Sequence, residues 1–332
     1  YYVKLAKELE KAGAHIIGIK DMAGVCRPEA AKALVTALKN EVALPIHFHT
    51  HDTSGLSAAT VLAAIEAGVD AVDTAMDSLS GLTSQPPMGS IIHALKGTPR
   101  ASRIYVDAMN EISTYWEGVR SIYAPFESTL RAGTSDVYNH EMPGGQYTNL
   151  REQARSMGLE PRWGEVSKAY AEVNKLLGDI VKVTPSSKVV GDMALMMVTQ
   201  DLTPEDVVNP DKEIAFPQSV VGLLKGELGI PEGGFPADIT KKALKDEVQI
   251  KGRPGAHLPP ADLVAEKENL EAYLGYEVSD ADLAAYLMYP AVFKGFKDHQ
   301  EKFGNIANIP SKVFFYGPAK DTYHTIELDK GK

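Results

Sequence analysis

The stretch HFHTHDTSG, residues 47–55, places three histidines at alternate positions, follows them with an aspartate and ends in a turn of small residues. Side chains at every second position of a β-strand share one face, so His47, His49 and His51 point the same way. Two imidazoles at the end of one strand can reach a single cation. A histidine in an apolar strand can equally be a hydrogen-bonded structural residue. The choice depends on the neighbouring strands.

The segments around residues 47–55 repeat one pattern of helix, glycine turn and apolar strand. EKAGAHII (10–17) is similar to EAGVDAV (66–72), and the helix between them begins at Pro28, which suits a first helical turn. Strand ends recur roughly every 25 to 30 residues, close to the ~31 of an eight-unit TIM barrel. We therefore predict that residues 1–95 form the last three βα units of such an α/β barrel. A small doubly wound sheet is the alternative.

The pattern becomes helical from about Ser90. Helices are predicted over 107–122, 150–158, 164–178, 189–200, 203–208, 217–228 and 238–246, with Pro- and Gly-rich connections between them. We interpret 96–311 as a helical extension that lines the site. Residues 312–332 are interpreted as the start of a further domain, with strand-like alternation near 323–327. Because the first helical pattern is already under way at Tyr1, we expect the chain to be a segment of a larger protein.

Charge and composition favour a small metabolite as the binding partner. The chain has 332 residues, 44% of them hydrophobic, and a net charge of −10, which argues against nucleic acid or an anionic membrane. Cys26 is the single cysteine, which excludes an internal disulfide. No apolar run approaches the ~20 residues that span a bilayer. We expect a cytoplasmic protein, or a mitochondrial matrix protein if the source is eukaryotic.

Lys20 lies at the end of the strand before residues 47–55. A protonated lysine would be repelled by a metal, and a salt bridge with Asp21 is its simplest role. A deprotonated lysine can instead take up carbon dioxide and form a carbamate, an anionic oxygen ligand. Lys20, His49 and His51 would then supply three ligands for a divalent metal.

Several residues near these three ligands are candidates for orienting or supporting them. His47 lies deeper along its strand and is predicted to support the ligands from behind. Asp21 and Asp52 are candidates for orienting the imidazoles. Asp73 and Asp77 flank the third strand end, where capping of the next turn explains them as well.

Further motifs carry a family resemblance, in this order and spacing: GIKDMAGV, HFHTHDTSG, DSLSGLTSQP, YWEGVRSIYAPFES, AGTSDVYNHEMPGGQYTNL, KVTPSSKVVGDMA, GGFP and GRPGAHLPP. The chain strongly resembles the carboxyltransferase domain of the pyruvate carboxylases over nearly its whole length. Oxaloacetate decarboxylase α chains and transcarboxylase large subunits share the barrel motifs. The sequences from 216–236 and 313–331 look more like the pyruvate carboxylases.

The resemblance implies a ligase that transfers a carboxyl group from carboxybiotin to pyruvate and yields oxaloacetate. It implies a metal, Zn, Mn, Co or Mg, held by carbamylated Lys20, His49, His51 and an aspartate on a barrel strand that this chain lacks. It matches Thr184 to a threonine that relays a proton between biotin and pyruvate. Ser187, Lys188 and Gln146 match biotin-pocket positions. Without the resemblance, Thr184 would be interpreted as a helix cap.

The resemblance also implies the partners. Biotin would be carried on another domain, and ATP would bind at a separate biotin-carboxylase domain, since the chain contains neither an AMKM biotin-attachment motif nor an ATP-binding glycine-rich loop. A homotetramer is expected for the complete protein. This segment alone is predicted to be catalytically incompetent.

Three other functions share part of the pattern. A metallohydrolase can pair a carbamylated lysine with two histidines, but it would leave VTPSSK and PGGQYTNL without a role. A biotin-independent lyase or synthase barrel shares the two histidines, although Lys20 is not an expected ligand there. An inactive structural fragment is the third alternative.

Overall fold

The histidine-bearing strand lies at the centre of a parallel sheet. In this computed structural model, which describes residues 1–304 and 306–317, β2 (Ile46–Thr50) lies between β1 (Ile17–Asp21) and β3 (Ala71–Val72). Lys20 pairs with His49 across the β1–β2 ladder, and His47 pairs with Ala71 of β3. The register therefore brings the ends of the first two strands to the same edge of the sheet.

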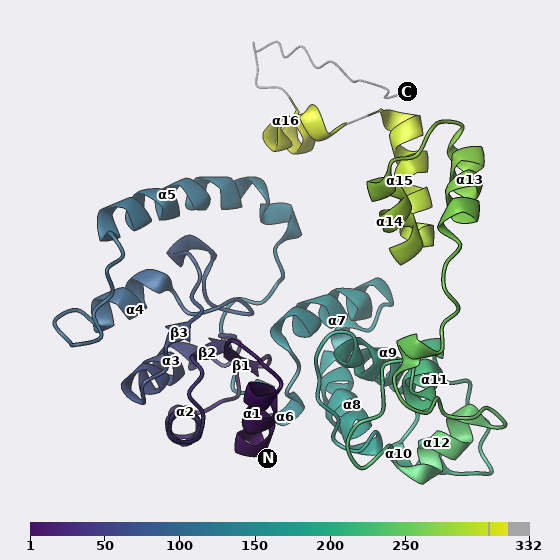
Figure 1. Cartoon of the computed structure of the whole chain (residues 1–332), viewed down its shortest axis with the longest axis horizontal. Coiled ribbons are helices and arrows are strands. Elements are labelled where there is room, and N and C mark those ends of the chain that lie inside the picture. The colour runs from purple at the N-terminus through teal and green to yellow at the C-terminus, as the bar shows by residue number, and fades with distance from the viewer. Residues whose placement is uncertain (305, 318–332) are drawn as a thin grey trace. The chain divides into compact units, whose positions relative to one another are not determined.

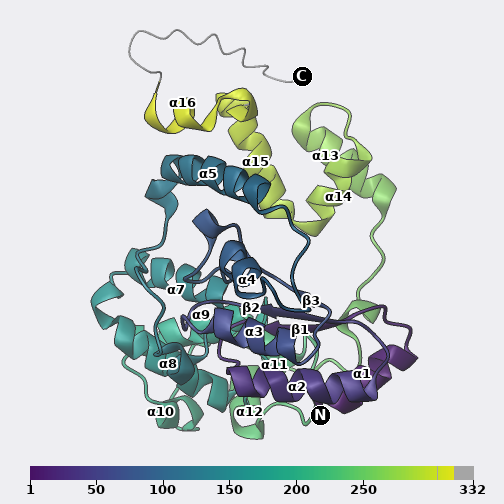
Figure 2. The same ribbon diagram turned by 90° about the vertical axis from the view of Figure 1, so that its left-hand side faces the viewer.

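The alternation along β2 separates its two faces. Ile46, Phe48 and Thr50 are buried, whereas His47 and His49 are partly exposed on the opposite face. The buried face packs on helices of a hydrophobic core that includes Ala31, Val35, Val61 and Ala64. Those helices are α1 (Tyr2–Lys11), α2 (Pro28–Glu41) and α3 (Ser57–Glu66). Figure 1 and Figure 2 both show α2 and α3 side by side against the sheet.

These are the three predicted βα units, in the predicted order. The partial TIM barrel is confirmed as the fold class by its family and structural relatives, which are reported below. The first strand, β1, begins at Ile17 and continues through Lys20 to Asp21. Lys20 therefore lies within β1, where the ladder fixes its position relative to His49.

A helical region follows the sheet. Its larger helices are α4 (Met88–Ala94), α5 (Val106–Ile122), α6 (Val137–His140), α7 (Gly144–Ser156), α8 (Trp163–Leu176), α9 (Ser186–Thr199), α10 (Pro204–Val208), α11 (Gln218–Lys225) and α12 (Ala237–Leu244). Short 3-10 turns lie at Asp77–Leu79, Ala124–Phe126, Glu160–Arg162, Pro254–Ala256 and Ile306–Asn308.

Helix α9 is central to this region. Ten of its residues are buried, from Ser187 to Val198, so the helix is apolar on nearly every side and other helices must surround it. It packs on α8, α7 and α11, and these elements share one core that runs from Met142 to Leu244. Figure 1 shows this bundle, α7 to α12, beside the sheet.

The predicted helices match the observed ones, with one informative difference. Helix α7 begins at Gly144 and not near residue 150, because the pair Gly144–Gly145 is helical here although glycine normally disfavours helix. The short helices α4 and α6 and the helices beyond residue 262 were not predicted.

A second compact unit begins at His257, inside the predicted 96–311 region. Its helices are α13 (Leu263–Leu274), α14 (Asp280–Met288), α15 (Pro290–Phe303) and α16 (Ser311–Tyr316). Leu270, Val278, Leu283 and Phe293 form its small core. The strand predicted near 323–327 lies outside the described residues, as does most of the domain predicted over 312–332.

Candidate metal centre

Two imidazoles, those of His49 and His51, meet at the C-terminal end of the central strand β2. The Nε2 atoms of His49 and His51 lie 3.1 Å apart. This spacing would suit a hydrogen bond if one ring donated a proton, so the protonation of the two rings decides what the pair can bind. The partners of their other nitrogens, the two Nδ1 atoms, settle that protonation.

Asp73 holds His49 from behind. Its Oδ2 lies 2.7 Å from Nδ1 of His49, and its Oδ1 lies 2.7 Å from Nε2 of His47. Burial acts to raise the pKa of Asp73, but the hydrogen bonds from His49 and His47 outweigh it and the pKa is lowered. A carboxylate accepts, so the proton of neutral His49 is at Nδ1. The Nε2 lone pair of His49 is then directed away from Asp73 and toward His51.

The carbonyl of Thr83 holds His51 in the same way. It lies 2.6 Å from Nδ1 of His51, and since a carbonyl can only accept, Nδ1 carries the proton. Burial lowers the pKa of His51, although the hydrogen bond to Thr83 opposes this. The neutral ring is therefore favoured. Its Nε2 lone pair faces that of His49.

Two lone pairs that face each other at 3.1 Å repel unless a cation lies near both. Neutral imidazoles with one nitrogen tied to a carboxylate or carbonyl are the usual arrangement of metal-binding histidines. The residues present thus fit a divalent metal. Across the described residues, 1–304 and 306–317, no group of three His, Cys, Asp or Glu side chains is placed to hold a metal. A further ligand of another type is needed, and exposed Lys20, paired with His49 across the ladder, lies beside the two imidazoles.

Asp21 and Asp52 make other contacts. Asp21 accepts hydrogen bonds from the backbone N–H groups of Val25 and Cys26 and from the Thr50 hydroxyl, so it shapes the turn after β1. Asp52 accepts from the backbone N–H and hydroxyl of Ser57 at the start of α3. The described hydrogen bonds of both carboxylates go to backbone and hydroxyl groups, and the imidazoles are oriented by Asp73 and Thr83 instead.

Glycine at position 144 lets the helical region reach the metal centre. A Cβ at Gly144 would lie 2.7 Å from Nδ1 of His51 and 2.8 Å from the carbonyl oxygen of Thr83. The Gly144 N–H donates to the carbonyl of Met22, which follows β1. The first residue of α7 is therefore seated between the ends of β1 and β2, over the hydrogen bond that orients His51.

The residues matched to the biotin pocket gather where α7 meets α9. Gln146 is in the first turn of α7, and its Nε2 would lie 2.6 Å from a Cβ at Gly191 of α9. Ser187 is buried one turn before Gly191. Lys188 is exposed and its Nζ donates to Asp192 at 2.6 Å. Thr184 is exposed in the loop that precedes α9, and it does not cap that helix.

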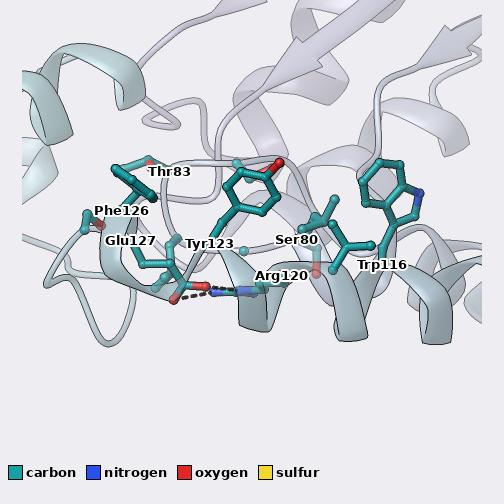
Figure 3. A pocket seen from close by; sticks show the side chains of 13 residues that line it. Ser80, Thr83, Trp116, Arg120, Tyr123, Phe126 and Glu127 are labelled. Carbon is teal, nitrogen blue, oxygen red and sulfur yellow. Dashed lines mark hydrogen bonds and ion pairs between the residues drawn. The ribbon is translucent and has the colours of Figure 1, made fainter. Parts of the chain in front are cut away.

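A cavity of about 520 Å³ adjoins the loop that carries Thr83. Figure 3 shows the Trp116, Tyr123 and Phe126 rings and the ion pair of Arg120 with Glu127, whose Nε–Oε1 distance is 2.6 Å. Arg120 also donates to the carbonyl of Ser78 at 2.7 Å. Helix α5 thus anchors the loop whose Thr83 carbonyl orients His51.

The chain matches two known protein families. Residues 137–332, more than half of the chain, match the family described as the conserved carboxylase domain. The chain belongs to the conserved carboxylase domain family. Residues 1–115 match the HMGL-like family, which agrees with the parallel sheet and its helices.

Individual relatives agree with this assignment. The chain is 47% identical over 332 residues to pyruvate carboxylase of Bacillus subtilis and 47% identical over 335 residues to mitochondrial pyruvate carboxylase of Homo sapiens. Both comparisons cover 100% of this chain but 29% and 28% of the relatives, so the chain spans less than a third of their length. The carboxyl transferase domain of Rhizobium etli pyruvate carboxylase, solved with pyruvate and biocytin, has a TM-score of 0.94 at 58% identity, over 100% of this chain and 56% of that one.

Among the described residues, no helix of the conserved carboxylase chain combines the length and apolarity needed to cross a bilayer. The curated relatives include bacterial and mitochondrial proteins.

Sequence reasoning missed three parts of the centre. Asp73 flanks the third strand end, and the sequence left open whether it serves the site or caps the next turn; the pairing of Phe48 with Val72 in the parallel ladder places it beside His49. The Thr83 carbonyl carries no side-chain signal. Gly144 did leave a signal, because two successive glycines at a helix start suggest a close approach of backbone to another group.

We predict that Gly144→Ala lowers the affinity of the protein for added divalent metal by about 10- to 100-fold, because the new methyl group displaces His51 from Thr83. The affinity is measured by equilibrium dialysis with metal analysis. Gly145→Ala is the matched control, since a Cβ there meets nothing within 4 Å. Equal metal affinities in the two variants would show that the close approach of Gly144 to His51 does not keep this imidazole in place for metal binding.

His140, the last residue of α6, should make the free energy of unfolding depend on pH in the acidic range. Its Nδ1 accepts the N–H of Met142 at 3.0 Å, and burial lowers the pKa of His140 from 6.5 to about 4 although Asp136 opposes the shift. The unfolded chain binds more protons in this range, so the contribution is complete above pH 6.5 and is lost as pH falls toward 4.

We predict that His140→Gln flattens this part of the pH dependence, because glutamine can accept the Met142 N–H but does not titrate. The measurement is the urea midpoint of unfolding at several pH values between 6.5 and 4. His93→Gln, on the exposed side of α4, is the control. An unchanged slope in His140→Gln would contradict the assignment.

Proposed function

We propose that this chain is the carboxyltransferase segment of a biotin-dependent pyruvate carboxylase, which moves a carboxyl group from carboxybiotin to pyruvate and forms oxaloacetate. The observation that carries the proposal is the pair of facing Nε2 atoms of His49 and His51, 3.1 Å apart, with both Nδ1 atoms tied back. It supplies the metal-binding geometry. The carboxyl transferase relative solved with pyruvate and biocytin supplies the substrate class.

Lys20 as its carbamate, His49 and His51 would hold the metal, with a fourth ligand, an aspartate, from a strand outside this chain. The donor set of two imidazole nitrogens and a carbamate oxygen suits Zn, Mn, Co or Mg to different degrees. A divalent cation there would polarise the carbonyl of the bound 2-oxo acid and stabilise its enolate. Asp73 and the Thr83 carbonyl accept hydrogen bonds from Nδ1 of His49 and of His51, which aims both Nε2 atoms at that position, and His47 contacts the second oxygen of Asp73.

The side chains near the start of α9 would carry the proton and the developing charge. The Thr184 hydroxyl both donates and accepts, so it can take the proton from the methyl group of pyruvate while it donates its own to biotin. The Lys188 ammonium and the Ser187 hydroxyl can donate to oxygen as negative charge develops. Gln146 lies against the same helix, one turn along, and would line the pocket.

The wider reaction needs parts outside this chain. ATP and bicarbonate would be used at a biotin-carboxylase domain, and a biotin-carrier domain would bring carboxybiotin to Thr184. A homotetramer is proposed for the complete protein, in the cytoplasm or the mitochondrial matrix. The solved complete, multifunctional pyruvate carboxylase of Rhizobium etli, whose chain is matched over 31% of its length at a TM-score of 0.93, supports a multidomain arrangement.

We predict that Thr184→Ala in the full-length protein lowers oxaloacetate formation by about 10²- to 10⁴-fold, because the proton has no other relay. Bicarbonate-dependent ATP cleavage should continue, since it takes place at another domain. A coupled malate dehydrogenase assay measures the first rate, and phosphate release measures the second. Thr114→Ala, an exposed threonine of α5, is the control. Full carboxylation in Thr184→Ala would rule out the relay.

We predict that Lys20→Ala lowers the bound metal of the full-length protein, with a loss of affinity of at least about tenfold, because one of the ligands is removed. Elemental analysis after gel filtration measures the metal. Lys32→Ala, an exposed lysine of α2, is the control. Wild-type metal content in Lys20→Ala would remove Lys20 from the ligand set.

A further inference from the structure

Two segments that carry the proposed chemistry are joined by one ion pair. The first, residues 140–144, which we name the strap, ends at Gly144 against His51. The second is the loop 181–186, which contains Thr184. Nζ of Lys182, in the loop, lies 2.9 Å from Oε2 of Glu141, in the strap. We propose that this ion pair is a positioning contact that sets Thr184 relative to the metal centre. The proposal rests on the function proposed above.

The strap is held at one end by the segment that follows β1 and at the other end by helix α6. The Gly144 N–H donates to the Met22 carbonyl at 2.8 Å, and the Glu141 N–H donates to the Val137 carbonyl at 2.7 Å. Between them, the Met142 N–H donates to Nδ1 of buried His140 at 3.0 Å. Glu141 itself has a φ of 52°, in the left-handed region that ends α6. Its carboxylate therefore extends from a backbone that is fixed relative to His51.

The loop is braced around Thr184. The Ser186 hydroxyl accepts the Val183 N–H at 3.1 Å and donates to the Val181 carbonyl at 2.7 Å. The Ser187 N–H donates to the Val183 carbonyl at 3.0 Å, which ties the loop to the first turn of α9. A loop closed in this way moves as one body. A displacement of Lys182, two residues before Thr184, therefore also displaces the threonine.

Burial distinguishes this ion pair from an ordinary surface pair. The Lys182 side chain is 11% exposed and that of Glu141 is 53% exposed. The enclosed ammonium has Glu141 as its described partner, so Glu141→Gln leaves that charge unpaired and costs stability, whereas Lys182→Met removes the charge and leaves only a carboxylate that is partly in water. A displacement of about 1 Å can nevertheless cost about 10²-fold in rate when a catalytic group is misplaced. The contact should matter for rate more than for stability.

The test uses the full-length protein with Glu141→Gln, Lys182→Met and both together. Each single variant is expected to lower kcat for carboxylation by about 10- to 100-fold, with KM for pyruvate and metal content unchanged. The unfolding midpoint should stay unchanged in Lys182→Met, which leaves no unpaired buried charge. The double variant is expected to lose no more than the single variants, because both remove the same contact. Lys182→Arg and the exchange Glu141→Lys with Lys182→Glu should each restore most of kcat.

The control is a pair of the same type with no link to the site. Lys168 and Glu172 of α8 lie 3.6 Å apart, with an exposed lysine and a half-buried glutamate, so Lys168→Met and Glu172→Gln should leave kcat unchanged. The proposal is overturned if Glu141→Gln and Lys182→Met keep kcat within about twofold. It is also overturned if the unfolding midpoint of Lys182→Met, or the metal content of either variant, falls together with kcat, which indicates a structural role.

The failure of the function itself has a different result. Wild-type protein that makes no oxaloacetate would overturn both the proposed function and the positioning role. Wild-type protein that makes it, together with fully active Glu141→Gln and Lys182→Met variants, would overturn the positioning role alone.

Discussion

The metal centre depends on a steric constraint at Gly144. The backbone of α7 begins where a side chain would collide with both His51 and the Thr83 carbonyl. That close approach joins the sheet to the helical bundle, because α7 packs on α8 and α9. A larger residue at position 144 would have to separate the helical bundle from the sheet or displace the imidazole. Glycine is tolerated at this helix start because the contact requires it, against its ordinary preference.

A second consequence follows from how the imidazoles are held. Asp73 and the Thr83 carbonyl each accept a hydrogen bond from Nδ1 of one imidazole, so both rings present a lone pair at Nε2. The two lone pairs would repel each other in an empty apolar setting, and the cost is balanced when a cation lies between them. His47 contributes through the carboxylate, since its own Nε2 lies against the second oxygen of Asp73. The centre is therefore organised from behind before any ligand binds.

Much of the fold could be predicted because the signals are local. The alternation Ile46, His47, Phe48, His49 and Thr50 follows the period of a strand, and the observed burial follows it residue by residue. The predicted helices of the extension have similar bounds in the structure, except where Gly144 begins α7. The boundary at His257 lies in the Pro- and Gly-rich stretch 251–260, which the sequence presents as one connection among several; only the separate cores decide that it divides two units.

The sequence by itself determined the three strand-bearing units, most helices up to residue 246, the shared face of the three histidines and, through resemblance, the proposed chemistry. Only the tertiary structure decided which carboxylate serves the imidazoles. Asp21 and Asp52 are adjacent to the ligands in sequence but turn toward backbone amides, while Asp73 comes from the neighbouring strand. The reason is physical: hydrogen-bond partners are selected by distance and direction in space, and in a parallel sheet the nearest groups belong to strands that are far apart in the chain.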